Sequence, residues 1–241
     1  KFNAEGQRIM ICFESKSLGD SLAWMPYVEE FRIKNKCHVL CSTFKNDLFK
    51  GQYPEIEFVE PGVGVNNIYG LYRLGLFYDD NRTIRYDNHP SNPKVEPLGK
   101  MATDILGLEY KELRPLIQNI SDERPIKNKY ICISEFASGP IKQWNNPVGW
   151  EKLIQMLKLY GYEIVSISKE KSNLKNITKL NGDLPLSDRA WYLKHCDFFI
   201  GMSSGLAWLA WACNTKVVMI SGVTIKENEF SQDCVRIYND N

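Results

Sequence analysis

The sequence predicts an α/β protein built on parallel β-sheets and divided into two halves. Short apolar or β-branched runs, which are typical of buried strands, alternate along the chain with longer runs of helical character. Two polar segments, residues 61–97 and residues 118–129, interrupt this alternation. The alternation indicates the fold class, and the interruptions indicate where the organisation of the chain changes.

The alternation also defines the expected elements in order. The expected strands are residues 9–13, 38–42, 56–60, 130–134, 163–168, 197–201 and 216–221. The expected helices are residues 20–35, 96–107, 147–161, 186–196 and 204–214. The third helix carries boundary signals, because Pro147 suits a first helical turn and Gly161 suits the residue that follows a last turn.

The two interruptions differ in composition. Residues 61–97 are rich in glycine, asparagine, proline and tyrosine without a clear period, so we expect a long functional loop there. Residues 118–129 are polar and contain a proline, which favours an interdomain linker. We therefore expect an N-terminal domain at 1–125 and a C-terminal domain at 126–241, with the ligand site in the cleft between them.

The overall composition excludes several function classes. The chain has 241 residues, a net charge of +1 and no basic block, so nucleic acid is not an expected partner. It has neither a signal peptide nor an apolar run long enough to cross a bilayer, so we expect a cytoplasmic protein without a membrane partner. The seven cysteines are scattered through apolar runs, so we expect buried thiols and no metal or cofactor within these residues.

The turn GMSSG, residues 201–205, lies between an expected strand and an expected helix. It matches the nucleophile elbow G-x-S-x-G, but no histidine follows it, so we do not expect a serine hydrolase. The free backbone N–H groups and positive dipole of a helix start could instead hold a diphosphate at Ser203, Ser204 and Gly205. A plain serine N-cap is the simpler alternative.

A second strand-end loop, ASGPIKQWNNP, contains Lys142. Its ammonium group could bind a phosphate as a point charge, whereas a solvated lysine is the simpler alternative.

A third strand-end loop, SGVTIKENEF, contains Glu227 and Glu229. A carboxylate at that place could hold the two hydroxyls of a ribose, although the sequence fits a solvated acidic loop equally well.

The turn ESKSLGD, which follows the first expected strand, contains Asp20. An aspartate at a helix start is often only a cap. If the diphosphate binds in the other half of the protein, Asp20 need not bind an anion, and its carboxylate could take a proton from an attacking hydroxyl.

The segments SLGDSLAWMPYVEEF, CSTFKNDLF, KQWNNPVGW and DFFIGMSSGLAWLAWA together resemble the bacterial autotransporter heptosyltransferases, relatives of the lipopolysaccharide heptosyltransferases. The similarity runs over nearly all the chain. It implies a GT-B architecture of two Rossmann-like domains and an ADP-heptose donor. It also implies serine hydroxyls of an autotransporter passenger protein as acceptors. We expect inverting transfer, because one base and direct displacement invert the anomeric configuration. Asp20 would be the catalytic base, and Lys142 and residues 203–205 would bind the donor diphosphate.

Two departures from the resembled families limit the expected function. Lipopolysaccharide heptosyltransferases carry a histidine where SGLAW has Trp208, so lipid A core is not the expected acceptor. The autotransporter family continues into a cysteine-rich, iron-binding segment, and this chain ends before such a cluster. We therefore expect a fragment of a longer protein, with any iron in the missing segment.

The acceptor contacts are expected in the aromatic loop at 61–97, on Tyr72 and Phe77, unless that loop only covers its own core. Two rival functions stay open: a lipopolysaccharide-core heptosyltransferase, and a non-catalytic nucleotide-sugar-binding protein of the same fold. The sequence also leaves open whether the protein forms a homo-oligomer.

Overall fold

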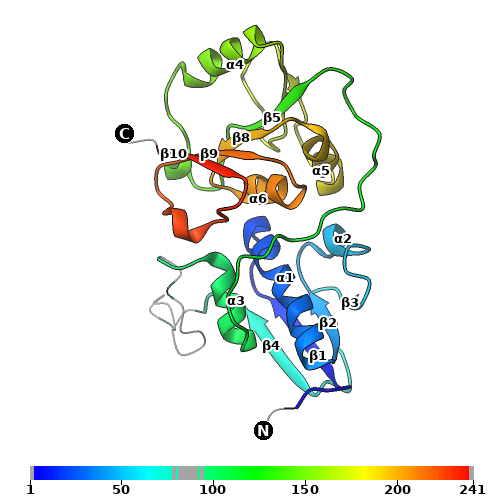
Figure 1. Cartoon of the computed structure of the whole chain (residues 1–241). Coiled ribbons are helices and arrows are strands. Elements are labelled where there is room, and N and C mark those ends of the chain that lie inside the picture. The colour runs from blue at the N-terminus through cyan, green and yellow to red at the C-terminus, as the bar shows by residue number, and fades with distance from the viewer. Residues whose placement is uncertain (1–2, 78–79, 81–91, 93–94, 239–241) are drawn as a thin grey trace. The chain divides into compact units, whose positions relative to one another are not determined.

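The computed structural model describes residues 3–77, 80, 92 and 95–238. It divides the chain into two compact units (Figure 1). Unit 1 comprises Lys1–Leu116 with Glu227–Phe230, and unit 2 comprises Ile117–Lys226 with Ser231–Asn241. The structural division therefore lies at residue 116, whereas the sequence places it near residue 125, within the polar stretch that contains neither helix nor strand.

Unit 1 contains a parallel four-stranded sheet in the order β3-β2-β1-β4. The strands are β1 (Arg8–Phe13), β2 (His38–Ser42), β3 (Ile56–Phe58) and β4 (Gly70–Leu74), and the helices are α1 (Leu18–Asn35), α2 (Asn46–Phe49) and α3 (Leu98–Leu106). Trp24 and Phe31 of α1 are almost fully buried. The Trp24 indole N–H donates to the carbonyl oxygen of Leu98 at 3.0 Å, which ties α1 to the start of α3.

The expectation of an irregular loop over residues 61–97 is wrong for residues 70–74, which form β4. This strand pairs with β1 along its length, with Ile11 opposite Tyr72. β4 is an edge strand in which only Leu74 is buried, and it contains a glycine and an arginine. Those properties remove the apolar alternation by which a strand is recognised in sequence. Residues 78–79, 81–91 and 93–94 of the segment lie outside the described residues.

Unit 2 contains a six-stranded sheet in the order β10-β9-β8-β5-β6-β7, in which every neighbouring pair is parallel. Its strands are β5 (Tyr130–Ser134), β6 (Glu163–Ser166), β7 (Thr178–Lys179), β8 (Phe199–Met202), β9 (Val217–Ser221) and β10 (Cys234–Tyr238). Its helices are α4 (Gly149–Leu159), α5 (Leu186–His195) and α6 (Gly205–Ala212). A buried cluster joins the central strands to α4, with Ile131, Ile133, Ile200 and Met202 packed against Trp150.

The start of α4 differs slightly from the expected start. The helix begins at Gly149 after the N-cap residue Val148, two positions beyond Pro147. A Cβ atom at Gly149 would lie 2.6 Å from the ring of Trp144, so only glycine lets this tryptophan rest on the helix start. Gly161 follows the helix with a φ of 81°, as expected of a residue that ends a helix.

Strand order indicates where each unit would bind a ligand. In unit 2 the chain passes from β5 to β6 on one side and later reaches β8 on the other side of β5. In unit 1 the chain passes from β1 to β2 on one side and later reaches β4 on the other side of β1. Open α/β sheets bind ligands beyond the carboxyl ends of the strands at such switch points. We therefore expect ligands to bind at the loops after β1 and β4 and at the loops after β5 and β8.

Candidate functional site

Asp20 lies at the switch point of unit 1, in the first turn of α1. Ser17 is the N-cap of this helix, and its Oγ accepts a hydrogen bond from the Asp20 N–H at 3.5 Å. The Asp20 carboxylate is half-buried, and its Oδ2 accepts a hydrogen bond from the Ser15 hydroxyl at 2.5 Å. Helix capping therefore belongs to Ser17, while the Asp20 side chain is held by the turn that precedes the helix.

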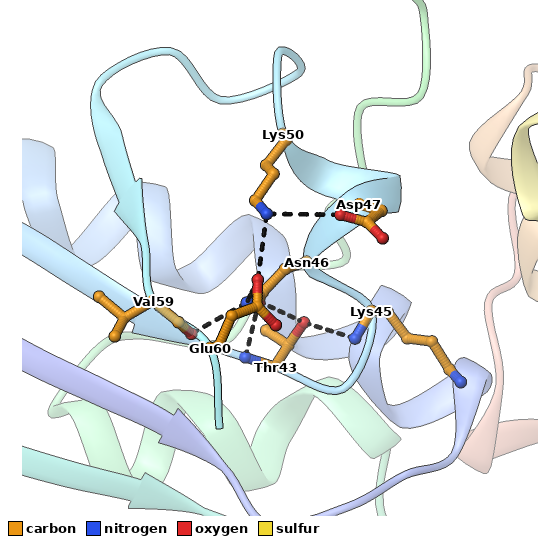
Figure 2. Close-up of polar contacts among 7 residues, drawn as sticks. All are labelled: Thr43, Lys45, Asn46, Asp47, Lys50, Val59 and Glu60. Carbon is orange, nitrogen blue, oxygen red and sulfur yellow. Dashed lines mark hydrogen bonds and ion pairs between the residues drawn. The ribbon is translucent and has the colours of Figure 1, made fainter. Parts of the chain in front are cut away.

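The loops after β2 and β3 are fixed by one buried side chain, Asn46, which is 4% exposed. Figure 2 shows its amide among Thr43, Val59 and Glu60. Its Oδ1 accepts from the Thr43 N–H at 2.9 Å and from the Thr43 hydroxyl at 3.1 Å. Its Nδ2 donates to the carbonyl oxygen of Val59 at 2.9 Å and to the Glu60 carboxylate at 3.4 Å. Two loops at the carboxyl edge of the sheet thus share a single rigid support.

Phe44, on the loop that Asn46 supports, is a residue that the sequence analysis did not select. Its side chain is 40% exposed, and the Lys16 ammonium lies 5.3 Å from its ring centroid. Because Lys16 belongs to the turn that precedes α1, this contact joins the loop after β2 to the Asp20 turn. An exposed aromatic ring that contacts the turn of a candidate catalytic residue is suited to contact a ligand.

The two expected acceptor residues have different surroundings. Tyr72 lies in β4, and its ring packs edge-on against buried Phe31 with 5.1 Å between centroids. Burial raises the pKa of the Tyr72 hydroxyl. Phe77 lies beyond the end of β4, where the Arg73 guanidinium is 5.3 Å from its ring and also donates to Glu14 at 2.6 Å. Phe77 thus lies beyond the carboxyl end of β4, whereas the Tyr72 ring belongs to the packing of α1 on the sheet.

Unit 2 holds a pocket that contains Lys142. The pocket has a volume of about 260 Å³, and its lining comes from the loop after β5, the end of β9 and the loop after β9: Ile141, Lys142, Gln143, Trp144, Asn145, Ile220, Gly222 and Val223. Trp144 packs edge-on against Trp150 of α4 with 5.4 Å between centroids. The ammonium of Lys142 is therefore the cationic group of a shaped, partly aromatic pocket at the carboxyl edge of the sheet.

The residues Ser203, Ser204 and Gly205 form the start of α6, at the switch point of unit 2. Ser204 is the N-cap residue, but its side chain makes no capping hydrogen bond. Its Oγ is buried and has no hydrogen-bond partner among the described residues. A plain serine cap therefore does not account for Ser204. None of these three residues lines the Lys142 pocket, so the structure places the two expected phosphate contacts on different loops of one edge.

The acidic residues Glu227 and Glu229 belong to unit 1 rather than to the C-terminal domain in which the sequence places them. After β9 the chain leaves the sheet, forms a short 3₁₀ turn (Lys226–Asn228) and buries Phe230 to 1% exposure. Glu227 is exposed and Glu229 is buried.

Sequence analysis also missed Glu135, a buried carboxylate directly after β5. Its Oε2 accepts a hydrogen bond from the Ser166 hydroxyl at 3.0 Å. Its Oε1 is buried without a partner in the part of the chain that the structure describes. The sequence did offer a signal for this residue, because Glu135 directly follows the last residue of an apolar strand.

The described residues contain no group of three or more histidine, cysteine or acidic side chains that could hold a metal ion. All seven cysteines are free, and burial raises the thiol pKa of Cys41, Cys132 and Cys213. No helix among the described residues has the length and apolarity that crossing a bilayer requires.

Three kinds of similarity to known proteins agree with this geometry. The family model described as glycosyltransferase family 9 (heptosyltransferase) matches residues 78–229. The autotransporter heptosyltransferase Aah of Escherichia coli is 35% identical over 234 residues, which are 92% of this chain and 59% of that protein. BimC of Burkholderia thailandensis, an inactive autotransporter heptosyltransferase, is 34% identical and is matched over 95% of this chain and 56% of its own length.

Solved structures give the same relationship. The crystal structure of TibC, an iron-containing dodecameric glycosyltransferase of enterotoxigenic E. coli, matches with a TM-score of 0.88 and 32% identity. The match covers 100% of this chain and 64% of that chain. A second structure holds TibC in complex with ADP-D-β-D-heptose and matches with a TM-score of 0.87. The chain thus spans about three fifths of the length of these relatives.

Proposed function

Because the chain belongs to glycosyltransferase family 9, the heptosyltransferases, we propose that its full-length protein transfers heptose from ADP-heptose to serine hydroxyls of an autotransporter protein. The observation that carries this proposal is the similarity to Aah, an autotransporter heptosyltransferase, over 92% of the chain. The TibC complex with ADP-D-β-D-heptose supports the choice of donor.

Asp20 is the proposed general base. Its carboxylate takes the proton of the acceptor hydroxyl while that oxygen attacks the anomeric carbon of the heptose. The bond between this carbon and the phosphate oxygen breaks, and ADP leaves with the bonding electron pair. A single displacement of this kind inverts the anomeric configuration. The support within the structure is the position of Asp20 at a switch point, with its carboxylate held by Ser15 rather than used as a helix cap.

Unit 2 is the proposed donor-binding unit. Its 260 Å³ pocket lies slightly below the range of about 300–1,000 Å³ that drug-sized ligands occupy, so it suits one portion of a nucleotide sugar. Lys142 would hold the diphosphate there, and negative charge increases on this group as ADP leaves. The N–H groups at the start of α6 and the unpartnered Ser204 hydroxyl offer further donors to the same anion.

The acceptor would bind to unit 1, which carries the proposed base. Phe77 stays a proposed acceptor contact, because it lies beyond the end of β4 at the ligand-binding edge. Tyr72 would act through the packing of β4 on α1, since its ring lies against Phe31. Glu227 and Glu229 would bind the ribose hydroxyls of ADP-heptose if unit 1 also contacts the nucleotide.

The test of this function is a transfer assay with the full-length protein, ADP-heptose and a purified autotransporter passenger. Mass spectrometry of the passenger should find heptose on serine residues. Asp20→Asn keeps the shape of the side chain and removes its basicity, so the transfer rate should fall about 100-fold or more while calorimetric donor affinity stays within about twofold. Full activity of this variant would remove Asp20 from the mechanism.

A second candidate function is donor binding without transfer. The inactive relative BimC favours it, because its identity to this chain, 34%, equals that of the heptosyltransferase TibC. Binding of ADP-heptose without any modification of the passenger, or of a lipopolysaccharide-core acceptor offered in parallel, would support this alternative.

We also propose a cytoplasmic location and an oligomeric full-length protein. The seven free cysteines fit a reducing compartment. TibC is dodecameric and contains iron, and this chain covers 64% of it. Metal analysis and light scattering of the full-length protein would test whether iron and the assembly belong to this protein too.

A further inference from the structure

We propose that Ser15 is a positioning residue that fixes the carboxylate of Asp20 and holds it in the ionised form. This inference rests on the proposed role of Asp20 as the general base. Ser15 lies on the turn between β1 and α1 and is half-buried, like Asp20 itself. It would not touch the substrate, and it would act only through the carboxylate.

The direction of the hydrogen bonds at Ser15 follows from the donors present. The Ser15 Oγ accepts a hydrogen bond from the backbone N–H of Ser17 at 3.1 Å. A hydroxyl has one hydrogen and two lone pairs, so this contact occupies a lone pair and leaves the hydrogen for another acceptor. That acceptor is the Asp20 Oδ2 at 2.5 Å. A distance this short is typical of a hydroxyl that donates to a charged carboxylate.

The neighbouring Ser17 performs a different task on the same turn. Its Oγ accepts from the Asp20 N–H, and its carbonyl oxygen accepts from the Ser21 N–H at 3.2 Å and from the Ser21 hydroxyl at 2.9 Å. These contacts hold the backbone at the start of α1. Ser17 thus fixes the backbone at the start of α1, and Ser15 fixes the side chain of Asp20.

A hydrogen bond donated to a carboxylate has two effects. It restricts the side-chain torsions, so the basic oxygens stay in one orientation, and it stabilises the charged form, which lowers the carboxyl pKa. A general base with a lowered pKa remains deprotonated at lower pH. Removal of the donor should therefore reduce the rate at all pH values and move the acidic limb of the activity profile upward.

The other charged groups near this turn have partners that do not include Ser15. Glu14 pairs with Arg73 at 2.6 Å, and Lys16 lies over the ring of Phe44. On α3, which packs against α1, Lys100 pairs with Asp104 at 2.9 Å and with Glu96 at 3.5 Å. Glu227 and Glu229 also belong to unit 1. A substitution of Ser15 leaves these charges unchanged, so a shift in the pH profile would report on its own hydrogen bond.

The experiment compares Ser15→Ala, Ser15→Thr and Ser17→Ala in the full-length protein, with ADP-heptose and the passenger over a pH series. Ser15→Ala should lower kcat about 10- to 100-fold, since hydrogen bonds to charged groups are worth that factor. Its acidic limb should move to higher pH, and the KM for ADP-heptose should stay within about twofold. Ser15→Thr keeps the hydroxyl and should restore both the rate and the limb.

Ser17→Ala is the matched control, because it removes a serine hydroxyl two residues away and keeps the N–H that binds Ser15. It should lower the melting temperature through loss of the cap, with the acidic limb unmoved. An unchanged kcat and limb in Ser15→Ala would overturn the inference, and so would equal limb shifts in both alanine variants. Full activity of Asp20→Asn would instead show that Asp20 is not the general base. That result is distinct from an unchanged Ser15→Ala, which would reject only the role of Ser15.

Discussion

Asn46 provides the sharpest test of how unit 1 holds its ligand-binding edge. Asn46→Ala removes the Oδ1 atom that accepts hydrogen bonds from the N–H and the hydroxyl of Thr43. It also removes the Nδ2 atom that donates to the carbonyl oxygen of Val59. Thr43 is 1% exposed, so its N–H would be left in the interior without a partner. Each buried polar group left unpaired costs about 1–3 kcal/mol. Val59 is half-exposed and can recruit water, so the expected loss in the free energy of unfolding is about 1–3 kcal/mol.

The assay for this loss is urea denaturation combined with hydrogen exchange by mass spectrometry. Exchange should accelerate in residues 39–60 more than in β5 or β8, because the support acts within unit 1. Asp47→Ala is the matched control: it removes an adjacent carboxylate that is 98% exposed and pairs with Lys50 at 3.4 Å, so stability should barely change. A loss below about 0.5 kcal/mol for Asn46→Ala, or equal losses for both variants, would refute the reasoning.

Two further predictions concern unit 2. Lys142→Ala should weaken ADP and ADP-heptose binding about 10- to 150-fold in calorimetric titrations, because a charge-assisted contact to the diphosphate is lost; an unchanged dissociation constant for both ligands would place Lys142 in solvent. Gly149→Ala should raise the KM for ADP-heptose several-fold with little change in kcat, because a Cβ there would displace Trp144, which lines the pocket. A KM within twofold of the parent would mean that the Trp144 ring does not shape the donor site.

Periodicity revealed the interior strands and the edge strand β3, but it did not reveal the edge strands β4, β7 and β10. The expected strands at 9–13 and 130–134 became β1 and β5, which are paired on both sides and mostly apolar. β4, β7 and β10 were not expected, because edge strands bury one face at most and carry polar residues. The expected α/β fold with two Rossmann-like domains of the GT-B type is confirmed by the match to TibC.

The candidate site was only partly visible in the sequence. Asp20 and Lys142 could be selected because each follows a recognisable strand, and strand ends are where ligands bind. Ser15 and Asn46 could not, since their importance lies in which atoms they reach after folding. The sequence places Glu227 and Glu229 in the C-terminal domain, whereas the structure groups both with unit 1.

The buried thiols give each unit a chemical reporter of its own unfolding. Only the thiolate reacts with alkylating reagents, and burial both shields Cys41, Cys132 and Cys213 and raises their pKa. Their alkylation therefore has to wait for the surrounding structure to open. Cys41 belongs to unit 1 and the other two belong to unit 2. The order in which these thiols become modified under mild denaturant would thus record which half of the chain opens first, without any added label.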